Sequence, residues 1–492
     1  MNISYYILKK IKNRNDRYLK FEDRVFRFDE IASNILKAAT FLKQQGVKKG
    51  DRVALKLNKS MEFIYLHFAN MLIGAVTLPL NPNYSVSETA YFLEDAQVTL
   101  FISDKENISS LTKTLTEFNI KPFDIKNLKL NEFEEHPLID LTKPSNTAII
   151  AYTSGTTGKS KGAMITHKNL ITNMEALKEL WRLSQNDKLL HVLPIFHVHG
   201  LVVALQGALN ACMDIVMHEK FDTLRTIETI KHEKITLFMG VPTIYNRLTQ
   251  ALQNLNGKTN FQSMRLFISG SAPLTEVVFN RFYNLTNHKI LERYGMSEAG
   301  MIASNPYEED KRIPLSVGYP IGDCKIKISK NSKEMPPNTV GEVYIKGSNV
   351  FKGYFKKPDK TRESFENGWF KTGDMGYLDN SGRLYLVGRA KELIITGGFN
   401  VYPKEVENVI DNMDCVVESA VFGVKDEDFG ERVEAAVVLK DSCKITEEVI
   451  IQECKKQLAP YKCPKRVHFL KELPKNAMGK IQKNFLSKQF SN

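Results

Sequence analysis

Short apolar runs alternate with amphipathic stretches from about residue 30 to residue 300, and this alternation constrains the fold more than any other feature of the sequence. The apolar runs resemble buried strands and occupy residues 52–57, 75–80, 98–103, 146–154, 189–194, 235–240 and 265–271. Amphipathic helical patterns lie between them at residues 28–46, 59–72, 86–95 and 167–182. Parallel sheets covered by helices produce this alternation. The sequence therefore predicts an α/β fold with doubly wound sheets.

The rest of the chain has a different character. Residues 315–388 alternate short strands with turns, including a hairpin turn at residues 380–382, and predict a small β-barrel-like part. The remainder, about one hundred residues from Arg389 onward, contains two strand and two helix patterns and predicts a small α+β domain. We therefore expect a large N-terminal domain at residues 1–388 and a small, mobile C-terminal domain at residues 389–492.

Cysteine spacing and apolar run lengths bear on the cellular setting. The cysteines form no C-x-x-C pair, and no histidine lies near them at zinc-ligand spacing, so we expect neither a disulfide framework nor a structural metal site. They are Cys212, Cys324, Cys415, Cys443, Cys454 and Cys463. The longest apolar stretch, FIYLHFANMLIGAVTLPL, is interrupted by polar residues and predicts a buried helix followed by a strand. The N-terminus does not resemble a signal peptide. A cytoplasmic protein without a membrane span is predicted.

A basic tail raises the question of nucleic-acid binding. Residues 451–492 contain ten Lys or Arg and two acidic residues, within a chain of net charge +12. The tail has neither interleaved aromatic residues nor a known nucleic-acid-binding signature, so we predict no nucleic-acid partner. Two interpretations remain open: a solvated lysine-rich face, or a surface for a small polyanion such as a nucleotide or coenzyme A.

The loop TSGTTGKSKG at residues 153–162 carries the clearest chemical signal. It contains GKS, but the P-loop pattern G-x-x-x-x-G-K-[ST] would need glycine where this chain has Thr153, so the loop is not a P-loop. It still follows an apolar strand and offers hydroxyl, backbone N–H and ammonium donors without any carboxylate. We predict phosphate binding, with a flexible surface loop as the alternative.

Six further segments occur after this loop, in an order and spacing that chance does not explain. They are LPIFHVHG (193–200), SGSAPL (269–274), ERYGMSEAG (292–300), WFKTGDMG (369–376), GRAKELIITGGFNVYPKEVE (388–407) and LPKNAMGK (473–480). Together with the loop they resemble the signature motifs of the adenylate-forming superfamily, and in particular AMP-forming acyl-CoA synthetases. The one departure is Ser160, where the family commonly has proline.

This resemblance implies a reaction and a nucleotide site. A carboxylate attacks the α-phosphorus of ATP to give an acyl-adenylate and pyrophosphate, and the thiol of coenzyme A then displaces AMP. The implied participants are ATP, Mg²⁺ and coenzyme A. The implied ATP- and AMP-binding residues are Thr153, Ser154, Gly155, Thr156, Thr157, Lys161, Ser271, Ala272, Pro273, Glu292, Tyr294, Gly295, Met296, Ser297, Asp374 and Arg389. Thr153 and Glu298 are the implied Mg²⁺ ligands, because this hard cation prefers oxygen.

The same resemblance assigns the remaining chemistry. Lys480, His197 and Glu298 are the implied catalytic residues, and Lys480 would stabilise negative charge in the first step. The small domain would rotate about a hinge at Lys391 between the two half-reactions. After rotation, Gly397, Gly398 and Phe399 would line the coenzyme A tunnel.

The identity of the acid is a separate question. Segments around ERYGMSEAG and GGFNVYPKEVE look most like those of malonyl-CoA synthetases, which must pair a second carboxylate with a cation or strong donors. His199 and Arg247 are the main candidates, Ser269 and Arg281 are weaker ones, and Met301 would limit the pocket length. Arg247 is alternatively a surface helix residue, and His199 a core histidine. A medium- or long-chain fatty acyl-CoA ligase is the alternative enzyme, and a non-catalytic nucleotide-binding protein is the alternative from another class.

Overall fold

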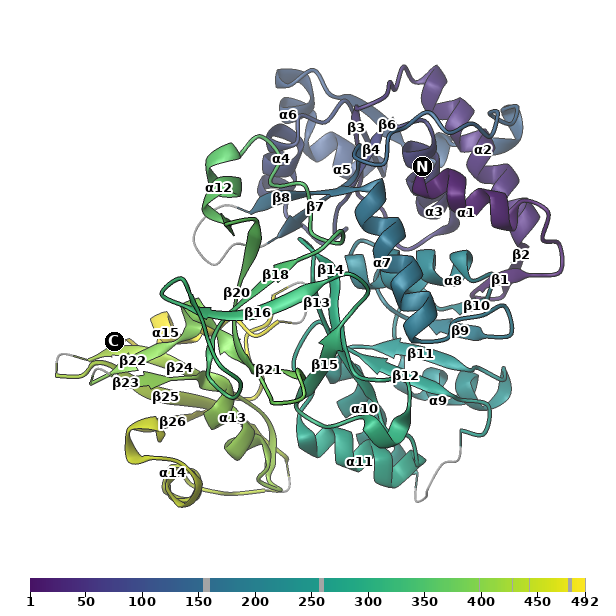
Figure 1. Ribbon diagram of the computed structural model, residues 1–492. Coiled ribbons are helices and arrows are strands. Elements are labelled where there is room, and N and C mark those ends of the chain that lie inside the picture. Colours follow the sequence, from purple (N-terminus) through teal and green to yellow (C-terminus); the bar gives the residue numbers. More distant parts are fainter. Residues whose placement is uncertain are drawn as a thin grey trace.

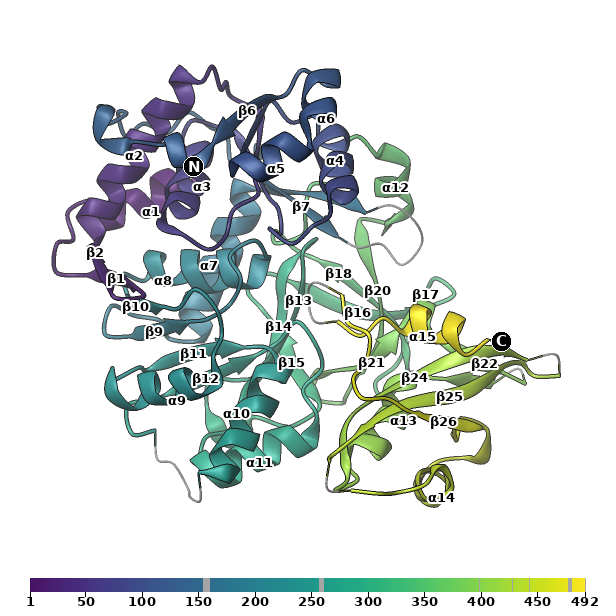
Figure 2. The same ribbon diagram turned by 180° about the vertical axis from the view of Figure 1, so that it is seen from behind.

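The computed structural model describes residues 1–153, 160–255, 261–397, 399–426, 428–441, 443–476 and 480–491. Two sheets and their helices form a large lobe, and a third sheet forms a small C-terminal lobe (Figures 1 and 2). The α/β class predicted from the sequence is confirmed.

The first sheet of the large lobe has the strand order β6-β5-β3-β4-β7-β8. Neighbouring strands from β6 to β7 are parallel, and only β8 runs antiparallel to its partner β7. The strands are β3 (Arg52–Leu55), β4 (Val76–Pro79), β5 (Leu100–Ser103), β6 (Lys121–Asp124), β7 (Thr147–Thr153) and β8 (Lys161–Thr166). Four of the predicted apolar runs are therefore strands of this sheet, and the phosphate-loop motif joins β7 to β8.

The second sheet follows the path β17-β16-β18-β20-β21-β15-β14-β13-β12-β11-β9-β10-β1-β2, with β19 beside β20. Strands β9 to β13 are parallel, whereas the segment from β14 to β21 is antiparallel and continues the same sheet through the β15–β21 pair. The strands are β1 (Tyr18–Phe21), β2 (Arg24–Arg27), β9 (Lys188–His191), β10 (Asp214–Met217), β11 (Leu237–Gly240), β12 (Leu266–Ser269), β13 (Leu291–Met296), β14 (Gly300–Ser304), β15 (Ser316–Pro320), β16 (Lys325–Lys330), β17 (Lys333–Glu334), β18 (Gly341–Lys346), β19 (Phe365–Glu366), β20 (Trp369–Leu378) and β21 (Leu384–Arg389). The other three predicted parallel strands are β9, β11 and β12.

Several helices of the large lobe begin at residues whose side chains cap them. Ser85 and Glu88 form a capping box at α4, and Thr166 and Asn169 form another at α7. The α-helices are α1 (Ile3–Ile11), α2 (Phe28–Gln44), α3 (Met61–Leu72), α4 (Val86–Asp95), α5 (Lys105–Ser110), α6 (Thr112–Glu117), α7 (His167–Leu180), α8 (Gly207–Asn210), α9 (Thr223–His232), α10 (Pro242–Asn254), α11 (Glu276–Thr286) and α12 (Pro358–Glu363). The predicted buried helix before a strand is α3, which leads into β4. Among the described residues, no helix combines the length and apolar character needed to cross a membrane.

Shorter helical turns occur in both lobes and between them. The 3₁₀ turns are η1 (Ile125–Asn127), η2 (Leu130–Glu132), η4 (Glu309–Lys311), η5 (Ala390–Glu392) and η6 (Pro460–Lys462). The segment η3 (His199–Gln206) is a π-helix, and all of its residues are buried. Because π-helical turns are rare and often mark functional sites, η3 directs attention to His199.

The small lobe has its own sheet, ordered β23-β22-β25-β24, with β26 parallel to β25. Its elements are β22 (Ile394–Thr396), β23 (Phe399–Val401), α13 (Pro403–Asp411), β24 (Val416–Asp426), β25 (Gly430–Leu439), α14 (Glu447–Gln457), β26 (Arg466–Phe469) and α15 (Lys483–Gln489). Buried apolar side chains of α13, α14 and the strands form a core separate from that of the large lobe. The helix α15 lies beside β24 (Figure 2).

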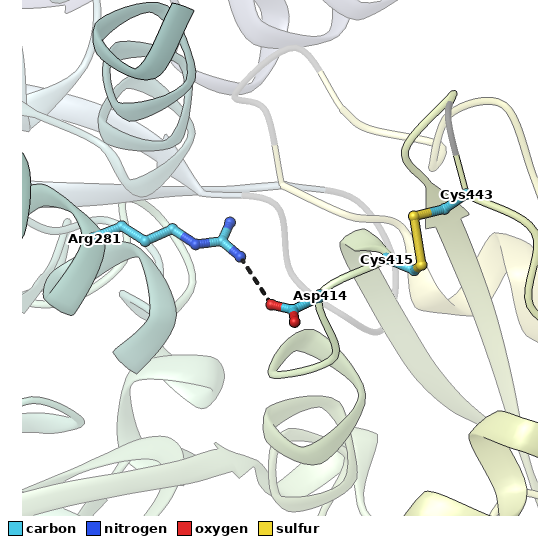
Figure 3. Close-up of a disulfide and its surroundings, with 4 residues drawn as sticks. All are labelled: Arg281, Asp414, Cys415 and Cys443. Atoms are coloured by element: carbon cyan, nitrogen blue, oxygen red, sulfur yellow. Dashed lines mark ion pairs between the residues drawn. A yellow bond between two sulfur atoms is a disulfide. The ribbon is translucent and has the colours of Figure 1, made fainter. Parts of the chain in front are cut away.

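The expectation that no cysteines pair was wrong for one pair. Cys415 and Cys443 form a disulfide, with Cα atoms 5.5 Å apart (Figure 3). The reason is topological: Cys415 precedes β24 and Cys443 follows β25, and the antiparallel pairing of Val416 with Leu439 brings the outer ends of these strands together. The remaining four cysteines are unpaired and buried.

Candidate active site

The buried carboxylate of Asp374, on β20, contacts two other predicted nucleotide-binding residues. Asp374 pairs in register with Arg389, and Nε of Arg389 lies 3.0 Å from Oδ1 of Asp374. The hydroxyl of Tyr294, from β13, donates to the other carboxylate oxygen. The Asp374 carboxylate raises the pKa of Arg389, whereas burial, followed by Asp374, raises the pKa of Tyr294. The three residues therefore form one cluster, although the contact between Tyr294 and Asp374 was not predicted.

The two predicted Mg²⁺ ligands also meet. The Thr153 hydroxyl donates to Oε1 of Glu298 over 3.2 Å, and the Tyr354 hydroxyl donates to the same oxygen over 3.1 Å. Glu298 is buried in the turn between β13 and β14. Lys161 places its ammonium 4.3 Å from the centre of the Tyr354 ring. Burial is the main cause that lowers the pKa of Lys161, and Glu298 opposes this effect.

The donor set around Glu298 fits a hard cation. It contains one carboxylate and the hydroxyls of Thr153 and Tyr354, all of them oxygen groups. Within the described ranges, no three His, Cys, Asp or Glu side chains gather as a metal cage. This arrangement suits Mg²⁺, which usually binds through one or two carboxylates together with substrate phosphates and water.

Tyr91 supports the far end of the phosphate-loop motif. Its hydroxyl donates to the Ser160 carbonyl over 2.7 Å. The hydroxyl of Tyr152, the residue just before the motif, donates to the Asp95 carboxylate over 2.7 Å. Asp95 also lies 2.7 Å from Nζ of Lys357. The segment that departs from the family pattern at Ser160 is thus held by α4. The predicted residues Ser154, Gly155, Thr156 and Thr157 lie outside the described residues.

Lys480 reaches this region from the small lobe. Burial is the main cause that lowers its pKa, and Arg389 lowers it further, while Asp374, Glu298 and Glu392 act in the opposite direction. The residue as a whole is exposed. Burial lowers the pKa of His197 to about 4, and Lys480 adds to this shift. The predicted catalytic residues are therefore electrostatic neighbours.

Two of the predicted acyl-pocket residues, His199 and Ser269, lie at the start of η3 and the end of β12. Oγ of Ser271 lies 3.2 Å from Nδ1 of the buried His199. Ser269 is also fully buried, and its hydroxyl has no hydrogen-bond partner among the described residues. Met301 is buried, and its methyl group contacts Gly295, because a Cβ at residue 295 would lie 2.5 Å from Cε of Met301.

The two arginine candidates lie on the outer helices of the large lobe. Arg247 is exposed on α10. Arg281, on α11, lies 3.9 Å from Asp414 of the small lobe (Figure 3). Their predicted contact with a substrate carboxylate stays a prediction.

A different arginine, Arg293, lies in the interior, and the sequence analysis missed it. It is 2% exposed, on β13, and its Nε and Nη2 atoms have no hydrogen-bond partner among the described residues. Burial lowers its pKa to about 9. A Cβ at Gly270 would lie 2.4 Å from its guanidinium carbon, and burial, followed by the Arg293 charge, lowers the pKa of His199. Arg293 therefore borders the segment between Ser269 and Ser271. An arginine within an otherwise buried strand pattern is the signal that could have revealed it.

Glu292, beside Arg293 on β13, faces the SGSAPL segment. Its Oε1 accepts a 2.9 Å hydrogen bond from the backbone N–H of Leu274, while Oε2 has no partner among the described residues. Burial raises its pKa to about 8. Ser271, Ala272 and Pro273, which the resemblance places in the nucleotide site, are exposed.

The predicted coenzyme A segment lies elsewhere. Gly397 adopts φ +56°, and Phe399 is exposed and stacks on Tyr461 with ring centres 4.7 Å apart. Figures 1 and 2 both place β22 and β23 well to the side of β13. Gly398 lies outside the described residues, and Lys391 lies in η5.

Comparisons with known proteins agree with this geometry. The sequence matches the family described as AMP-binding enzyme over residues 10–355, and the AMP-binding enzyme C-terminal domain over residues 405–480. The chain belongs to the AMP-binding enzyme family. It is an AMP-forming acyl-CoA ligase, for which ATP, Mg²⁺ and coenzyme A are the expected participants.

Individual relatives differ in the acid that their names specify. A long-chain-fatty-acid–CoA ligase of Bacillus subtilis (strain 168) is 34% identical over 94% of this chain and 90% of its own length. A malonate–CoA ligase of Arabidopsis thaliana is 33% identical over 91% of this chain and 79% of its own. Membership of the family therefore leaves the substrate open.

One solved structure also bears on the conformation. ATP-bound MatB from Rhodopseudomonas palustris is 37% identical, covers 100% of this chain and 99% of its own, and superposes with a TM-score of 0.94. The apo crystal structure of the same protein gives 0.84. The structure described here thus superposes better on the ATP-bound form than on the apo form.

Proposed function

We propose that the protein activates malonate or a similarly short dicarboxylate as its coenzyme A thioester. The observation that carries the proposal is the buried Arg293 guanidinium, two of whose nitrogens have no hydrogen-bond partner among the described residues. A buried charge without a partner is costly, and a substrate carboxylate would supply both the opposite charge and two acceptors. Ser269 and His199 would complete the polar end of the acyl site. The malonate–CoA ligase of Arabidopsis thaliana supports the same choice.

A fatty acyl-CoA ligase is the second candidate, supported by the Bacillus subtilis relative. In that case a hydrocarbon chain would lie against Arg293 and leave its donors unpaired. Met301, packed on Gly295, would also limit the length of the site. Both features favour a short, charged acid.

The first half-reaction follows from the side chains that face one another. The acid's carboxylate attacks the α-phosphorus of ATP, and the bond to pyrophosphate breaks. We propose that Lys480 stabilises the charge that develops there, and that Asp374 and Arg389 hold the ribose. Glu298 and Thr153 would hold Mg²⁺, which neutralises charge on the phosphates. Lys161 contributes a further cation beside Glu298.

The second half-reaction needs other groups at the same adenylate. The thiol of coenzyme A attacks the activated carbonyl, and AMP leaves. The segment with Gly397 and Phe399 is remote from β13 here, so we propose that the small lobe rotates about Lys391 to bring it in. The boundary at residue 389 and this hinge belong to the proposal, as does the cytoplasmic location predicted from the sequence.

One experiment tests the substrate. The purified protein is incubated with ATP, Mg²⁺, coenzyme A and, separately, oxalate, malonate, methylmalonate, acetate, octanoate or palmitate, and thioesters are identified by mass spectrometry. We expect malonyl-CoA as the main product. Palmitoyl-CoA without any dicarboxylate product would refute the proposal, and absence of both thioester and AMP would favour a non-catalytic nucleotide-binding protein.

A matched pair of variants tests the residue. Arg293→Met should lower kcat/KM for malonate at least about 30-fold, since truncating one partner of a buried charge pair costs about 2–5 kcal/mol. Activity with acetate should fall much less. Arg182→Met is the control, because Arg182 has no role in the predicted site and pairs with Glu308 on the surface. Arg247→Met should raise the KM for malonate if the prediction from the sequence holds.

A further inference from the structure

Residues 474–476 and 480–482 pair with each other in the small lobe, and this paired segment, which carries Lys480, is called the hairpin. Lys475 forms a β-bridge with Ile481, and the backbone N–H of Gln482 donates to the Pro474 carbonyl over 2.8 Å. Closer to the tip, the N–H of Asn476 donates to the Lys480 carbonyl over 2.9 Å, and Oδ1 of Asn476 accepts from the N–H of Lys480 over 3.0 Å. The backbone thus fixes Lys480 relative to its own hairpin. It does not by itself fix the hairpin relative to the lobe.

Lys483 lies directly after this hairpin, at the start of α15, and points into the lobe. Its Nζ lies 2.6 Å from Oε1 of Glu407 on α13 and 3.5 Å from Oε2 of Glu392 in η5. The Lys483 side chain is 16% exposed and that of Glu407 is 7% exposed. Glu407 is itself fixed, because Oε1 also accepts the backbone N–H of Val421 over 3.0 Å. The ion pair therefore ties the base of the hairpin to the core of the small lobe.

Glu392 connects the same cluster to the proposed hinge. It is the residue after Lys391 and the last residue of η5. Its carboxylate acts on two lysines: it opposes the effect of burial on the pKa of Lys480, and it helps Glu407 to raise the pKa of Lys483 against burial. The hinge-side carboxylate is thus an electrostatic neighbour of both ends of the hairpin.

We propose that Lys483, held by Glu407 and Glu392, is the positioning residue that sets where the Lys480 ammonium stands during adenylation. Lys483 does not touch the substrates. It acts by fixing the hairpin base to α13 and to the residue beside the hinge, so that closure of the small lobe delivers Lys480 to one place. The inference rests on the proposed role of Lys480 and extends it to a residue with no role in the predicted site.

The two half-reactions provide a test that a purely structural role would fail. The adenylation rate is measured by ATP–pyrophosphate exchange with an acid that the protein accepts. The rate of thioester formation is measured after coenzyme A is added to a chemically prepared acyl-adenylate of the same acid. Lys483→Met should lower the adenylation rate about 10- to 100-fold, the effect of roughly 1 Å of misplacement at a reacting group. The thioester step should change less than about twofold, because the rotated lobe no longer presents Lys480. Lys483→Arg, which keeps the charge, should recover most of the adenylation rate.

Further variants separate the possible outcomes. Glu392→Gln removes one partner and leaves the 2.6 Å pair with Glu407, so the fold persists; it should slow adenylation severalfold and spare the thioester step. Lys475→Met is the matched control, since Lys475 lies on the same hairpin but pairs with Glu418 on β24 at 2.8 Å, and both half-reactions should match the parent. Equal losses in both half-reactions for Lys483→Met and Glu392→Gln would overturn the inference.

Lys480→Ala distinguishes failure of the inference from failure of its premise. If Lys480→Ala abolishes adenylation while Lys483→Met and Glu392→Gln keep the parent rate, the positioning role is wrong. If Lys480→Ala itself adenylates at the parent rate, the proposed role of Lys480 is wrong and the inference fails with it. Selective loss of adenylation in all three variants is the expected result.

Discussion

Arg293 packs its guanidinium against the backbone of Gly270, so closely that a Cβ at residue 270 would lie 2.4 Å from Cζ and 2.6 Å from Nε and Nη1. Gly270→Ala should therefore displace the guanidinium, which is the free end of a flexible side chain and can move without unfolding the lobe. We expect kcat/KM for malonate to fall roughly 10- to 100-fold, because small misplacements at a reacting site have large effects. Steady-state kinetics and the thermal unfolding midpoint measure the two quantities.

The control for this variant is another glycine with room for a methyl group. A Cβ at Gly207 would meet nothing closer than the Val202 carbonyl at 4.0 Å, so Gly207→Ala should leave malonate kinetics unchanged. Parent-like malonate kinetics in Gly270→Ala would show that the position of Arg293 does not determine use of this acid.

The raised pKa of Glu292 predicts that the free energy of unfolding depends on pH. Burial raises its pKa to about 8, well above the 4.5 of an unfolded glutamate. Between these values the folded state holds a proton that the unfolded state has lost, so the stability due to this group decreases as pH rises from 4.5 and stops decreasing above about 8. Relative to Glu292→Gln, the parent should lose about 1.4 kcal/mol of unfolding free energy from pH 7 to pH 9.

Denaturant unfolding at several pH values measures this difference. The Gln variant keeps an acceptor for the Leu274 N–H and has no titrating group at residue 292, so subtraction removes the contribution of groups that do not interact with Glu292. A parent-minus-variant difference that stays constant from pH 7 to pH 9 would contradict the assigned environment of Glu292.

Tyr354 is expected to orient Glu298 through its hydroxyl and Lys161 through its ring. Tyr354→Phe removes a hydrogen bond to a charged group, worth about 1.5–3 kcal/mol. We expect roughly a tenfold increase in the Mg²⁺ concentration that half-saturates ATP–pyrophosphate exchange. Tyr354→Leu, which also removes the ring beneath Lys161, should raise the KM for ATP in addition.

Tyr344→Phe serves as the comparison, because its hydroxyl donates over 3.2 Å to Glu366 rather than to Glu298. It should leave the Mg²⁺ dependence unchanged. An equal effect of the two Tyr→Phe variants would mean that Tyr354 has no specific role at Glu298.

The strands and helices were predictable because the sequence patterns that specify them are local. Buried parallel strands such as β5 and β12 are continuous apolar runs, and helices such as α4 carry their own capping residues, so neighbouring residues in the sequence suffice. The clustering of Asp374 with Arg389 and of Thr153 with Glu298 was implied by the family motifs. The contacts of the Tyr294 hydroxyl with Asp374 and of the Tyr354 hydroxyl with Glu298 come from the structure, because these tyrosines lie on other segments of the chain.

The features that escaped prediction depend on contacts distant in the sequence. Arg293 lies against Gly270 only because β12 and β13 are adjacent. The π-helix that begins at His199 has no local pattern that distinguishes it from an α-helix. Arg247, one of the two main candidates for the second carboxylate, is exposed on α10, because the sequence of a helix does not by itself reveal which face its neighbours cover.

The pairing of Cys415 with Cys443 makes the small lobe sensitive to reduction. The disulfide joins residues 28 apart across the outer ends of β24 and β25. In the chain-entropy description, a loop of this length stabilises the folded state by about 3.5 kcal/mol. Cys415→Ser and Cys443→Ser should each lower the unfolding midpoint of the oxidised protein, and the double variant should lose no more than either single variant, because both sulfurs are needed for one bond.

A thiol reductant should lower the parent midpoint to that of the variants and leave the variants unchanged. Additive losses in the double variant, together with a parent midpoint insensitive to reductant, would mean that the two cysteines contribute only as separate packed thiols.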